Sequence, residues 1–274
     1  MKDKKTLFID LDGTLFDKNG ISRISSKNLK ILRLIKPFAN IVFSTGRSFD
    51  DIRVKQTLKQ TGINDIICCS GSHIFVDSQC IYNNLFDKEV LNQIVQWAFA
   101  RKIIVVLFDE IGELIYTHNW FEYAVIKLVL SKKLKKIRYA KNFNLEKLGD
   151  INKIAFIVKN PNQNLTLIKE LEKAFPKTIN AYAASKNYVI EITDSKSDKG
   201  IALKKYCDYK NIDLKNTIHI GDSMADASVK GIANKLVAMG NSTKELKAVA
   251  DEIAPKAKNG GIYKYFMSKV KKND

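Results

Sequence analysis

Cysteine and long apolar runs are both scarce in this sequence. Its 274 residues include four cysteines, and none are spaced as the CxxC pairs of zinc or thiol-redox sites, so free thiols are expected rather than disulfides. No apolar run approaches the roughly 20 residues that span a bilayer. The apolar stretch behind the basic N-terminus stops at Asp10 and is too short for the core of a signal peptide. We therefore expect a cytoplasmic protein with no membrane partner.

Acidic residues are also scarce, because 46 lysines and arginines face 29 aspartates and glutamates, for a net charge of +17. Such a balance can indicate a nucleic-acid partner or a lysine-rich, solvated surface that steers anions weakly. Lysine greatly outnumbers arginine, the residue favoured for bidentate recognition of phosphates and bases. We therefore expect no nucleic-acid partner and interpret the basic run 132–141 as a solvated face. A glycine-rich dinucleotide fingerprint is absent too, so no redox cofactor is expected.

Strands and helices are predicted to alternate at both ends of the chain. Apolar strands at 6–9, 40–43 and 63–69 are separated by helical patterns, which gives the βαβαβ order of a parallel sheet. The same order resumes near Asp198, whereas hairpins and helices mix in between. The sequence thus predicts an α/β fold in which residues 1–82 and 194–274 form a parallel-sheet core and residues 83–193 form an inserted α+β domain.

Two carboxylates follow the first predicted strand. Asp10 and Asp12 are two positions apart, and residues i and i+2 of an extended strand point to the same side. In an open parallel sheet, ligands bind at the carboxyl ends of the strands, where both residues lie. Two like charges held so close need a cation or hydrogen-bond donors nearby. The stretch also fits an acidic turn that simply ends a strand, since Asp-Gly is a common turn pair.

Other element ends in the predicted parallel part also carry polar residues: Thr45 with Gly46, Lys199, and Asp222 with Asp226. Carboxylates can bind Mg²⁺ or attack as nucleophiles, and a hydroxyl and a lysine can hold phosphoryl oxygens. The set therefore suits phosphoryl transfer. Each residue alone also has a simpler interpretation, with Lys199 as an ordinary first-turn lysine and Thr45 and Asp222 as helix caps.

His219 and Arg47 lie close in sequence to these residues, but we give them other roles. His219 lies within an apolar strand, and we interpret it as a core residue rather than a catalytic base. Arg47 follows Gly46 directly and either stabilises the phosphate region or braces the core.

The order of the motifs resembles that of a known family. The segments Asp10-Leu11-Asp12-Gly13-Thr14, Ser44-Thr45-Gly46-Arg47, Lys199 and Gly221-Asp222 with Asp226 are similar to the four motifs of the haloacid dehalogenase-like (HAD) phosphatases. The long insert between the second and third motifs resembles the cap of the Cof-type (IIB) subfamily, and the tail segments 239–251 and 259–262 are also similar to that subfamily. The resemblance implies a Rossmann-like parallel core with an inserted α+β cap of type C2B.

The resemblance also implies a role for each residue. Asp10 would be the nucleophile and a Mg²⁺ ligand, and Asp12 would be the general acid/base, with its backbone carbonyl as a further ligand. Asp222 would be the second carboxylate on Mg²⁺. Asp226 would orient a metal-bound water or the lysine. The phosphoryl group would be bound by Thr45, Gly46 and Lys199.

On this basis we expect a Mg²⁺-dependent phosphatase that hydrolyses phosphate monoesters, such as sugar phosphates or similar small metabolites, through an aspartyl-phosphate. The cap would close over the site, exclude water and supply specificity contacts, with loops near 108–113 or 183–187 as candidates to reach the substrate. Two other functions stay open: a phosphotransferase or phosphomutase of the same superfamily, and a non-catalytic regulatory binding protein. The regulatory hypothesis rests on the basic charge and on Ser70 and Ala225, which stand where the family usually has asparagine.

Overall fold

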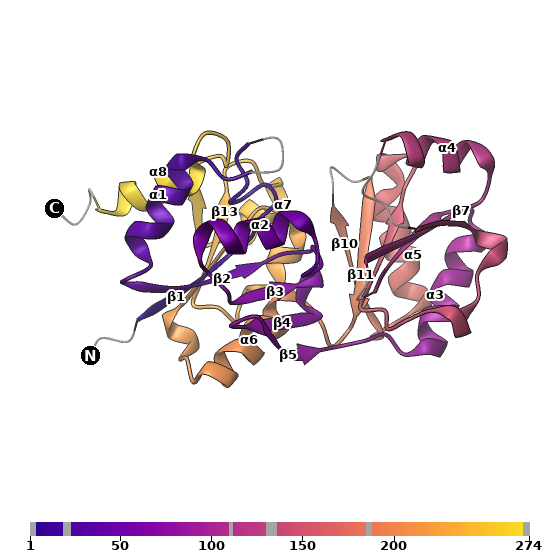
Figure 1. The fold of residues 1–274 in the computed structure, drawn as a ribbon, viewed down its shortest axis with the longest axis horizontal. Helices are drawn as coiled ribbons and strands as arrows, with labels where there is room; N and C mark the ends of the chain where they lie inside the picture. Colours follow the sequence, from indigo (N-terminus) through magenta and orange to yellow (C-terminus); the bar gives the residue numbers. More distant parts are fainter. Residues whose placement is uncertain (1–3, 19–22, 110–111, 130–135, 185–187, 271–274) are drawn as a thin grey trace. The chain divides into compact units, whose positions relative to one another are not determined.

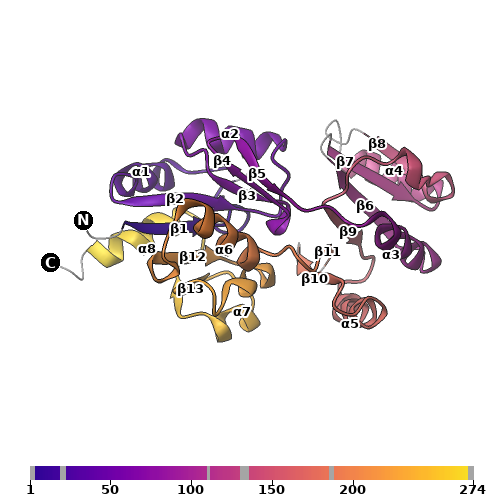
Figure 2. The same ribbon diagram turned by 90° about the horizontal axis from the view of Figure 1, so that it is seen from below.

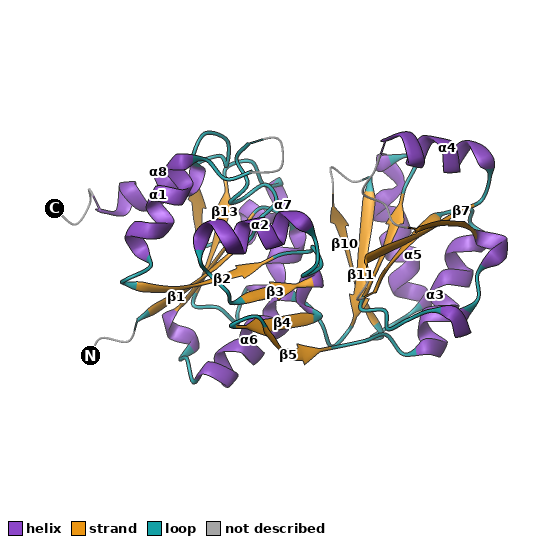
Figure 3. Cartoon of the chain, in the orientation of Figure 1, coloured by secondary structure: helices purple, strands orange, loops and turns teal. Residues whose placement is uncertain are grey.

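The computed structural model describes residues 4–18, 23–109, 112–129, 136–184 and 188–270. The chain divides into two compact units, one formed by Met1–Tyr82 with Asp198–Asp274 and the other by Asn83–Ser197 (Figure 1). Each unit holds one β-sheet with helices packed on it (Figure 3). The loops expected to reach the substrate, near 108–113 and 183–187, and the basic run 132–141 lie partly outside the described residues. No helix in the described ranges is long and apolar enough to cross a membrane.

An eight-stranded sheet in the order β14-β13-β12-β1-β2-β3-β4-β5 forms the first unit. The strands from β14 to β3 run parallel, and β4 is antiparallel to β3. The strands are β1 (Lys5–Ile9), β2 (Ala39–Ser44), β3 (Ile66–Cys68), β4 (His73–Val76), β5 (Gln79–Asn83), β12 (Thr217–Gly221), β13 (Lys235–Met239) and β14 (Glu252–Ala254).

Helices cover both faces of this sheet, which is why its strands have near-continuous apolar sequences. One face packs against α1, α2 and α8, and the other against α6 and α7. Figure 2 shows α1 and α2 on one side of the sheet and α6 and α7 on the other. The helices are α1 (Ser26–Ile35), α2 (Ile52–Thr61), α6 (Lys199–Lys210), α7 (Lys244–Val249) and α8 (Gly261–Val270).

The second unit has a six-stranded sheet in the order β10-β11-β9-β6-β7-β8, antiparallel except between β7 and β8. One face packs against α3 and α5, and Ile126 of α4 packs on the other. The elements are α3 (Lys88–Ala100), β6 (Ile104–Asp109), β7 (Gly112–Thr117), α4 (Trp120–Val129), β8 (Lys136–Tyr139), β9 (Lys153–Ile157), α5 (Asn164–Ala174), β10 (Ile179–Ala184) and β11 (Val189–Asp194). The two sheets confirm the predicted α/β fold class with its inserted α+β part.

The chain returns from the second unit to the first between Ser197 and Asp198. The hydroxyl of Thr193 donates to the carbonyl of Ser197 at 2.6 Å, and the side-chain amide of Asn180 donates to the same carbonyl at 3.1 Å. These hydrogen bonds hold the turn after β11 against β10 and β11. The division therefore lies four residues beyond the 193/194 position expected from the sequence.

A close approach of two backbones places the start of α6. The short 3₁₀ helix η1 (Cys69–Gly71) follows β3, and a Cβ added to Gly71 would lie 2.2 Å from the carbonyl oxygen of Asp198. Gly71 also has a φ of +108°, a conformation that side chains rarely adopt. Asp198 caps α6, because its Oδ1 accepts the N–H of Ile201 at 2.7 Å. The absence of a side chain at Gly71 thus allows Asp198, and with it Lys199, to take its position.

We predict that Gly71→Ala lowers the free energy of unfolding by about 3 kcal/mol or more, because it combines backbone strain with a clash against the Asp198 carbonyl. Gly231→Ala is the matched control, since Gly231 has a φ of +82° but open space at the Cβ position. Gly231→Ala should lower the free energy of unfolding by only about 1–2 kcal/mol, because it adds backbone strain without a clash. Urea unfolding of both variants measures the difference, and equal losses would contradict the steric argument.

Candidate active site

Three adjacent parallel strands bring predicted site residues to one edge of the sheet. β1 pairs with β12 on one side and with β2 on the other, all in the same direction. Asp10 follows β1, Thr45 follows β2 and Asp222 follows β12. The N–H of Asp10 also donates to the carbonyl of Ile220 at 2.9 Å, which extends the β1–β12 pairing to the first carboxylate. The three side chains therefore start from neighbouring positions.

Lys199 is the first residue of α6, and its ammonium is buried between two carboxylates. The Nζ atom lies 2.8 Å from Oδ1 of Asp10 and 2.6 Å from Oδ1 of Asp226. Only 3% of Lys199 is exposed. Burial acts to lower the pKa of Lys199, but the charges of Asp10 and Asp226 outweigh it and hold that pKa above its usual value. The lysine is therefore a fixed cation that joins the two carboxylates.

Asp226 is fully buried in the 3₁₀ helix η7 (Met224–Val229), and donors surround both of its oxygens. Its Oδ1 accepts from Lys199 and lies 2.8 Å from Nε2 of His219. Its Oδ2 accepts the backbone N–H of Asp222 at 3.1 Å and the N–H and hydroxyl of Ser223 at 2.9 and 3.0 Å. Burial acts to raise the pKa of Asp226, but the charge of Lys199 and the contact with His219 hold it below its usual value. Asp226 is thus an ionised carboxylate whose acceptor positions are filled.

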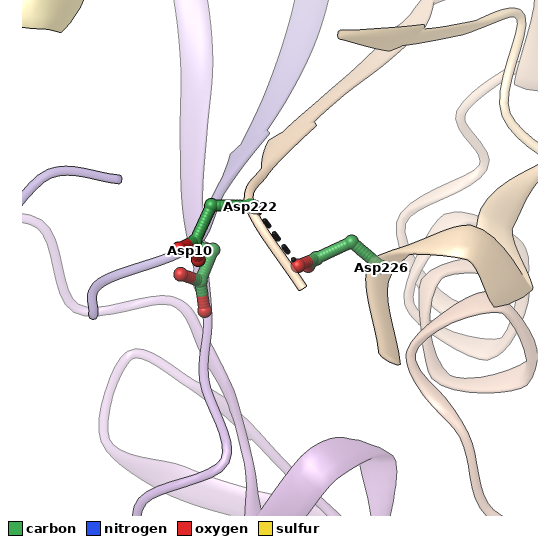
Figure 4. A group of neighbouring side chains, drawn as sticks. All are labelled: Asp10, Asp222 and Asp226. Atoms are coloured by element: carbon green, nitrogen blue, oxygen red, sulfur yellow. Dashed lines mark hydrogen bonds between the residues drawn. The ribbon is translucent and has the colours of Figure 1, made fainter. Parts of the chain in front are cut away.

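The pKa values of Asp10 and Asp222 are shifted in the opposite direction to that of Asp226. Burial raises the pKa of Asp10 well above its usual value, against the charge of Lys199. Burial, followed by the charge of Asp226, raises the pKa of Asp222 to about 7. Ligand oxygens of Asp10, Asp222 and Asp226 all lie within 4.8 Å of one another (Figure 4). Three carboxylates around one ammonium leave an excess of negative charge at this edge.

The acidic cluster fits a hard divalent cation in its donor chemistry. All three donors are carboxylates, and Mg²⁺ prefers oxygen ligands. Because the oxygens of Asp226 already accept five contacts, Asp10 and Asp222 are the residues that could hold such an ion. A cation beside them would relieve the repulsion and desolvation that raise their pKa values.

The carboxylate of Asp12 is bound to Arg47 instead of joining this cluster. Arg47 donates from Nε and Nη2 to the two Asp12 oxygens, each at 2.5 Å, and from Nη1 to Asp51 at 2.9 Å. β1 ends at Ile9, so the strand alternation that would place Asp10 and Asp12 on one side does not extend to Asp12. The guanidinium therefore holds Asp12 and Asp51, a contact that neither of the two roles considered for Arg47 included.

Thr45 and Gly46 form the loop after β2, and backbone hydrogen bonds fix that loop. Thr45 is 1% exposed; its N–H donates to Ile67 O at 2.8 Å, and its carbonyl accepts the N–H of Ser70 at 3.1 Å. Its hydroxyl accepts the N–H of Arg47 at 3.2 Å. Gly46 lies between these two anchored residues. The loop therefore presents its backbone at the same edge as Asp10.

Asn241 and Gly13 belong to the site although the sequence assigns them no role. The side-chain amide of Asn241 donates to Gly13 O at 2.9 Å and to Oδ2 of Asp222 at 3.3 Å. A Cβ on Gly13, whose φ is +76°, would lie 2.1 Å from Oδ2 of Asp222. Asn241 follows β13, so the strand-end argument used for Asp10 could have found it. The contact of His219 with Asp226 had no such signal, because an apolar strand suggests only burial.

Comparison with known proteins now decides the family. A family model of the haloacid dehalogenase-like hydrolases matches residues 7–266. The chain belongs to this family. Membership confirms the resemblance inferred from the motifs and the predicted enzyme class, a hydrolase.

Two curated relatives and one solved structure illustrate the match. The chain is 29% identical to a putative phosphatase of Buchnera aphidicola subsp. Acyrthosiphon pisum over 271 residues, 94% of this chain and 93% of the relative. It is 26% identical to the phosphatase YwpJ of Bacillus subtilis, over 91% of this chain and 94% of the relative. A HAD subclass IIB sugar phosphatase superposes with a TM-score of 0.82 at 19% identity, covering 97% of this chain and 99% of the other. This structural likeness confirms the HAD fold with a Rossmann-like core and cap.

The raised pKa of Asp222 predicts how stability depends on pH in metal-free protein. The folded state binds this proton more tightly than the unfolded chain, whose Asp has a pKa near 4, so stability is lost as pH rises from about 4 to about 7. Asp222→Asn removes this loss of stability. As the pH rises from 5 to 8, its free energy of unfolding should therefore increase relative to that of the wild type by about 1–3 kcal/mol. Urea unfolding in the presence of EDTA measures this.

The control is Asp208→Asn, on the exposed side of α6, where Asp208 forms an ion pair with Lys204. It should show no such trend over the same pH range. An Asp222→Asn effect that stays constant with pH would contradict the electrostatic account of the cluster.

Proposed function

We propose that this protein hydrolyses phosphate monoesters with Asp10 as the nucleophile. The observation that carries the proposal is the buried ammonium of Lys199 between Asp10 and Asp226, beside Asp222. A lysine in this position opposes the effect of burial on Asp10 and favours the ionised form that can attack phosphorus. The names of the curated relatives, which are phosphatases, support the same class of reaction.

The reaction would proceed in two balanced steps through an aspartyl-phosphate. First, an oxygen of Asp10 attacks phosphorus, the bond from phosphorus to the leaving oxygen breaks, and Asp12 gives that oxygen its proton. Next, Asp12 takes a proton from a water that attacks the aspartyl-phosphate, and the bond from phosphorus to Asp10 breaks to release phosphate. Lys199 and the backbone of Thr45 and Gly46 would hold the phosphoryl oxygens. Mg²⁺ held by Asp10 and Asp222, with the backbone carbonyl of Asp12, would supply charge neutralisation for the phosphoryl group.

Before it takes part in this reaction, Asp12 is hydrogen-bonded to Arg47. The guanidinium donates to both oxygens of Asp12, and in the second step a carboxylate oxygen of Asp12 would accept a proton from water. The first step requires the protonated form, so the carboxyl has to leave Arg47 as the substrate binds. The side chain of Asp12 is 43% exposed, which permits this movement.

Sugar phosphates or similar small phosphorylated metabolites are the proposed substrates. One of the structural neighbours that superpose over nearly the whole chain is a sugar phosphatase. The net charge of +17 favours anionic substrates in general through long-range attraction. A phosphorylated small molecule is therefore the proposed partner rather than nucleic acid.

Asp10→Asn should lower phosphate release from a panel of phosphate monoesters with Mg²⁺ by about a thousandfold or more, because an amide cannot form the aspartyl-phosphate. The measurement is free phosphate over time. Asp208→Asn, which changes the same residue type far along α6, should keep full activity.

Undiminished hydrolysis by Asp10→Asn would overturn the mechanism. The same assay separates hydrolysis from group transfer, because a phosphomutase or phosphotransferase would give an isomerised or newly phosphorylated sugar in place of free phosphate. Salt-sensitive binding of nucleic acid without turnover would support the regulatory hypothesis instead.

Mg²⁺ should stabilise the wild-type protein against unfolding and should not stabilise Asp222→Asn. At a Mg²⁺ concentration of 100 times its Kd, the expected gain is about 2.7 kcal/mol for the wild type. Asp208→Asn should gain as much as the wild type. Thermal unfolding with EDTA or Mg²⁺ checks this, and equal stabilisation of Asp222→Asn would place the metal elsewhere.

A further inference from the structure

His219 occupies the middle of β12, a strand covered on both faces. Its neighbours in the sheet are Phe8 of β1 and Leu236 of β13. These two residues belong to the apolar cluster that packs under α6, together with Leu203. The imidazole itself is fully buried. An aliphatic side chain would fit such surroundings without the desolvation that a polar ring requires.

The two ring nitrogens of His219 have different environments. Nε2 lies 2.8 Å from Oδ1 of Asp226, whereas Nδ1 is buried with no hydrogen-bond partner in the described part of the chain. An ionised carboxylate only accepts hydrogen bonds, so Nε2 must carry the hydrogen. Nδ1 is then a bare acceptor, which is costly in an apolar cluster. The hydrogen bond to Asp226 is the contact that accounts for a histidine at this position.

We propose that His219 is a positioning residue that fixes Asp226 and, through it, Lys199 beside the nucleophile. The inference rests on the proposed phosphatase function. His219 and Lys199 donate to the same oxygen of Asp226, so the imidazole sets where that oxygen lies and where the ammonium is anchored. The other oxygen is held by Ser223 and by the N–H of Asp222.

The consequence for the reaction follows from the geometry of Lys199. Its ammonium donates to Oδ1 of Asp10 at 2.8 Å and to Oδ1 of Asp226 at 2.6 Å at the same time, so the position of Asp226 bears on the contact with Asp10. Without the His219 donor, Oδ1 of Asp226 keeps its contact with Lys199 but loses the donor that fixes its own position, so the ammonium is held less firmly beside Asp10. His219 itself does not contact Asp10. Its loss should therefore lower kcat much more than it changes KM.

Variants that keep or remove the donor separate this role from simple packing. His219→Gln places an amide N–H near the position of Nε2, whereas His219→Met fills similar space without a donor and His219→Asn is too short to reach Asp226. We expect the Met and Asn variants to lose about ten- to a hundredfold in kcat, the range for a hydrogen bond to a charged group, with KM within about twofold of wild type. The Gln variant should stay within about threefold in both.

His118→Met is the matched control, since Nε2 of His118 lies 2.7 Å from Ile103 O in the second unit. Losing this hydrogen bond should leave kcat unchanged. Thermal unfolding of every variant shows whether each is folded. Nitrogen NMR of the wild-type imidazole gives a measurement without substitution, and it should show the neutral ring with its hydrogen on Nε2.

Three results would overturn the role of His219: a hydrogen on Nδ1 in the wild type, Met or Asn variants with wild-type kcat, or a Gln variant as impaired as Met and Asn. If the Met and Asn variants fail to fold, the Gln variant and the wild-type NMR decide. Absence of turnover by the wild-type protein itself would overturn the proposed function and this role together. Loss of the contrast among the His219 variants, with an active wild type, would overturn this role alone.

Discussion

One buried ammonium determines how the acidic edge of the parallel sheet is arranged. Asp10 follows β1, whereas Asp222 and Asp226 both follow β12, and the mutual repulsion of the three carboxylates in a desolvated site would push these two strand ends apart. Lys199 joins two of them at 2.8 and 2.6 Å. Removing one partner of such a buried pair leaves an uncompensated charge and costs about 3–5 kcal/mol. The geometry of the site and the stability of the edge therefore depend on the same contact.

The fold supplies this contact through two constraints on α6. Its first turn must meet the ends of β1 and β12, and the close approach of Gly71 to Asp198 sets where the helix begins. Asp198 then caps the helix, so Lys199 enters the site from a fixed backbone position. Beyond this first turn, the apolar residues of α6 pack on the sheet. Core packing and site geometry are thus coupled through one helix start.

The strand-end argument predicted much of this site, because parallel strands carry their carboxyl ends to one edge. It placed Asp10, Thr45 and Asp222 at the ends of parallel strands, and the three residues directly follow the neighbouring strands β1, β2 and β12 in the structure. It could not predict that Asp12 turns to Arg47, because where β1 ends depends on pairing with distant strands. The sequence pattern also did not predict strand β8 within the basic run or the short edge strand β14. Both segments have little apolar periodicity, and both become strands by pairing with a neighbouring strand.

The backbones of Ser70 and Ala225, which stand where the family usually has asparagine, both form hydrogen bonds in this chain. Ser70 is 1% exposed with a φ of +54°, and its N–H holds the Thr45 carbonyl. Asparagine tolerates that conformation better than serine. Ala225 is also buried, and its carbonyl accepts the hydroxyl of Ser228 at 2.9 Å. The ammonium of Lys199 donates to Asp10 and Asp226, so these two contacts do not depend on the side chain at position 70 or 225.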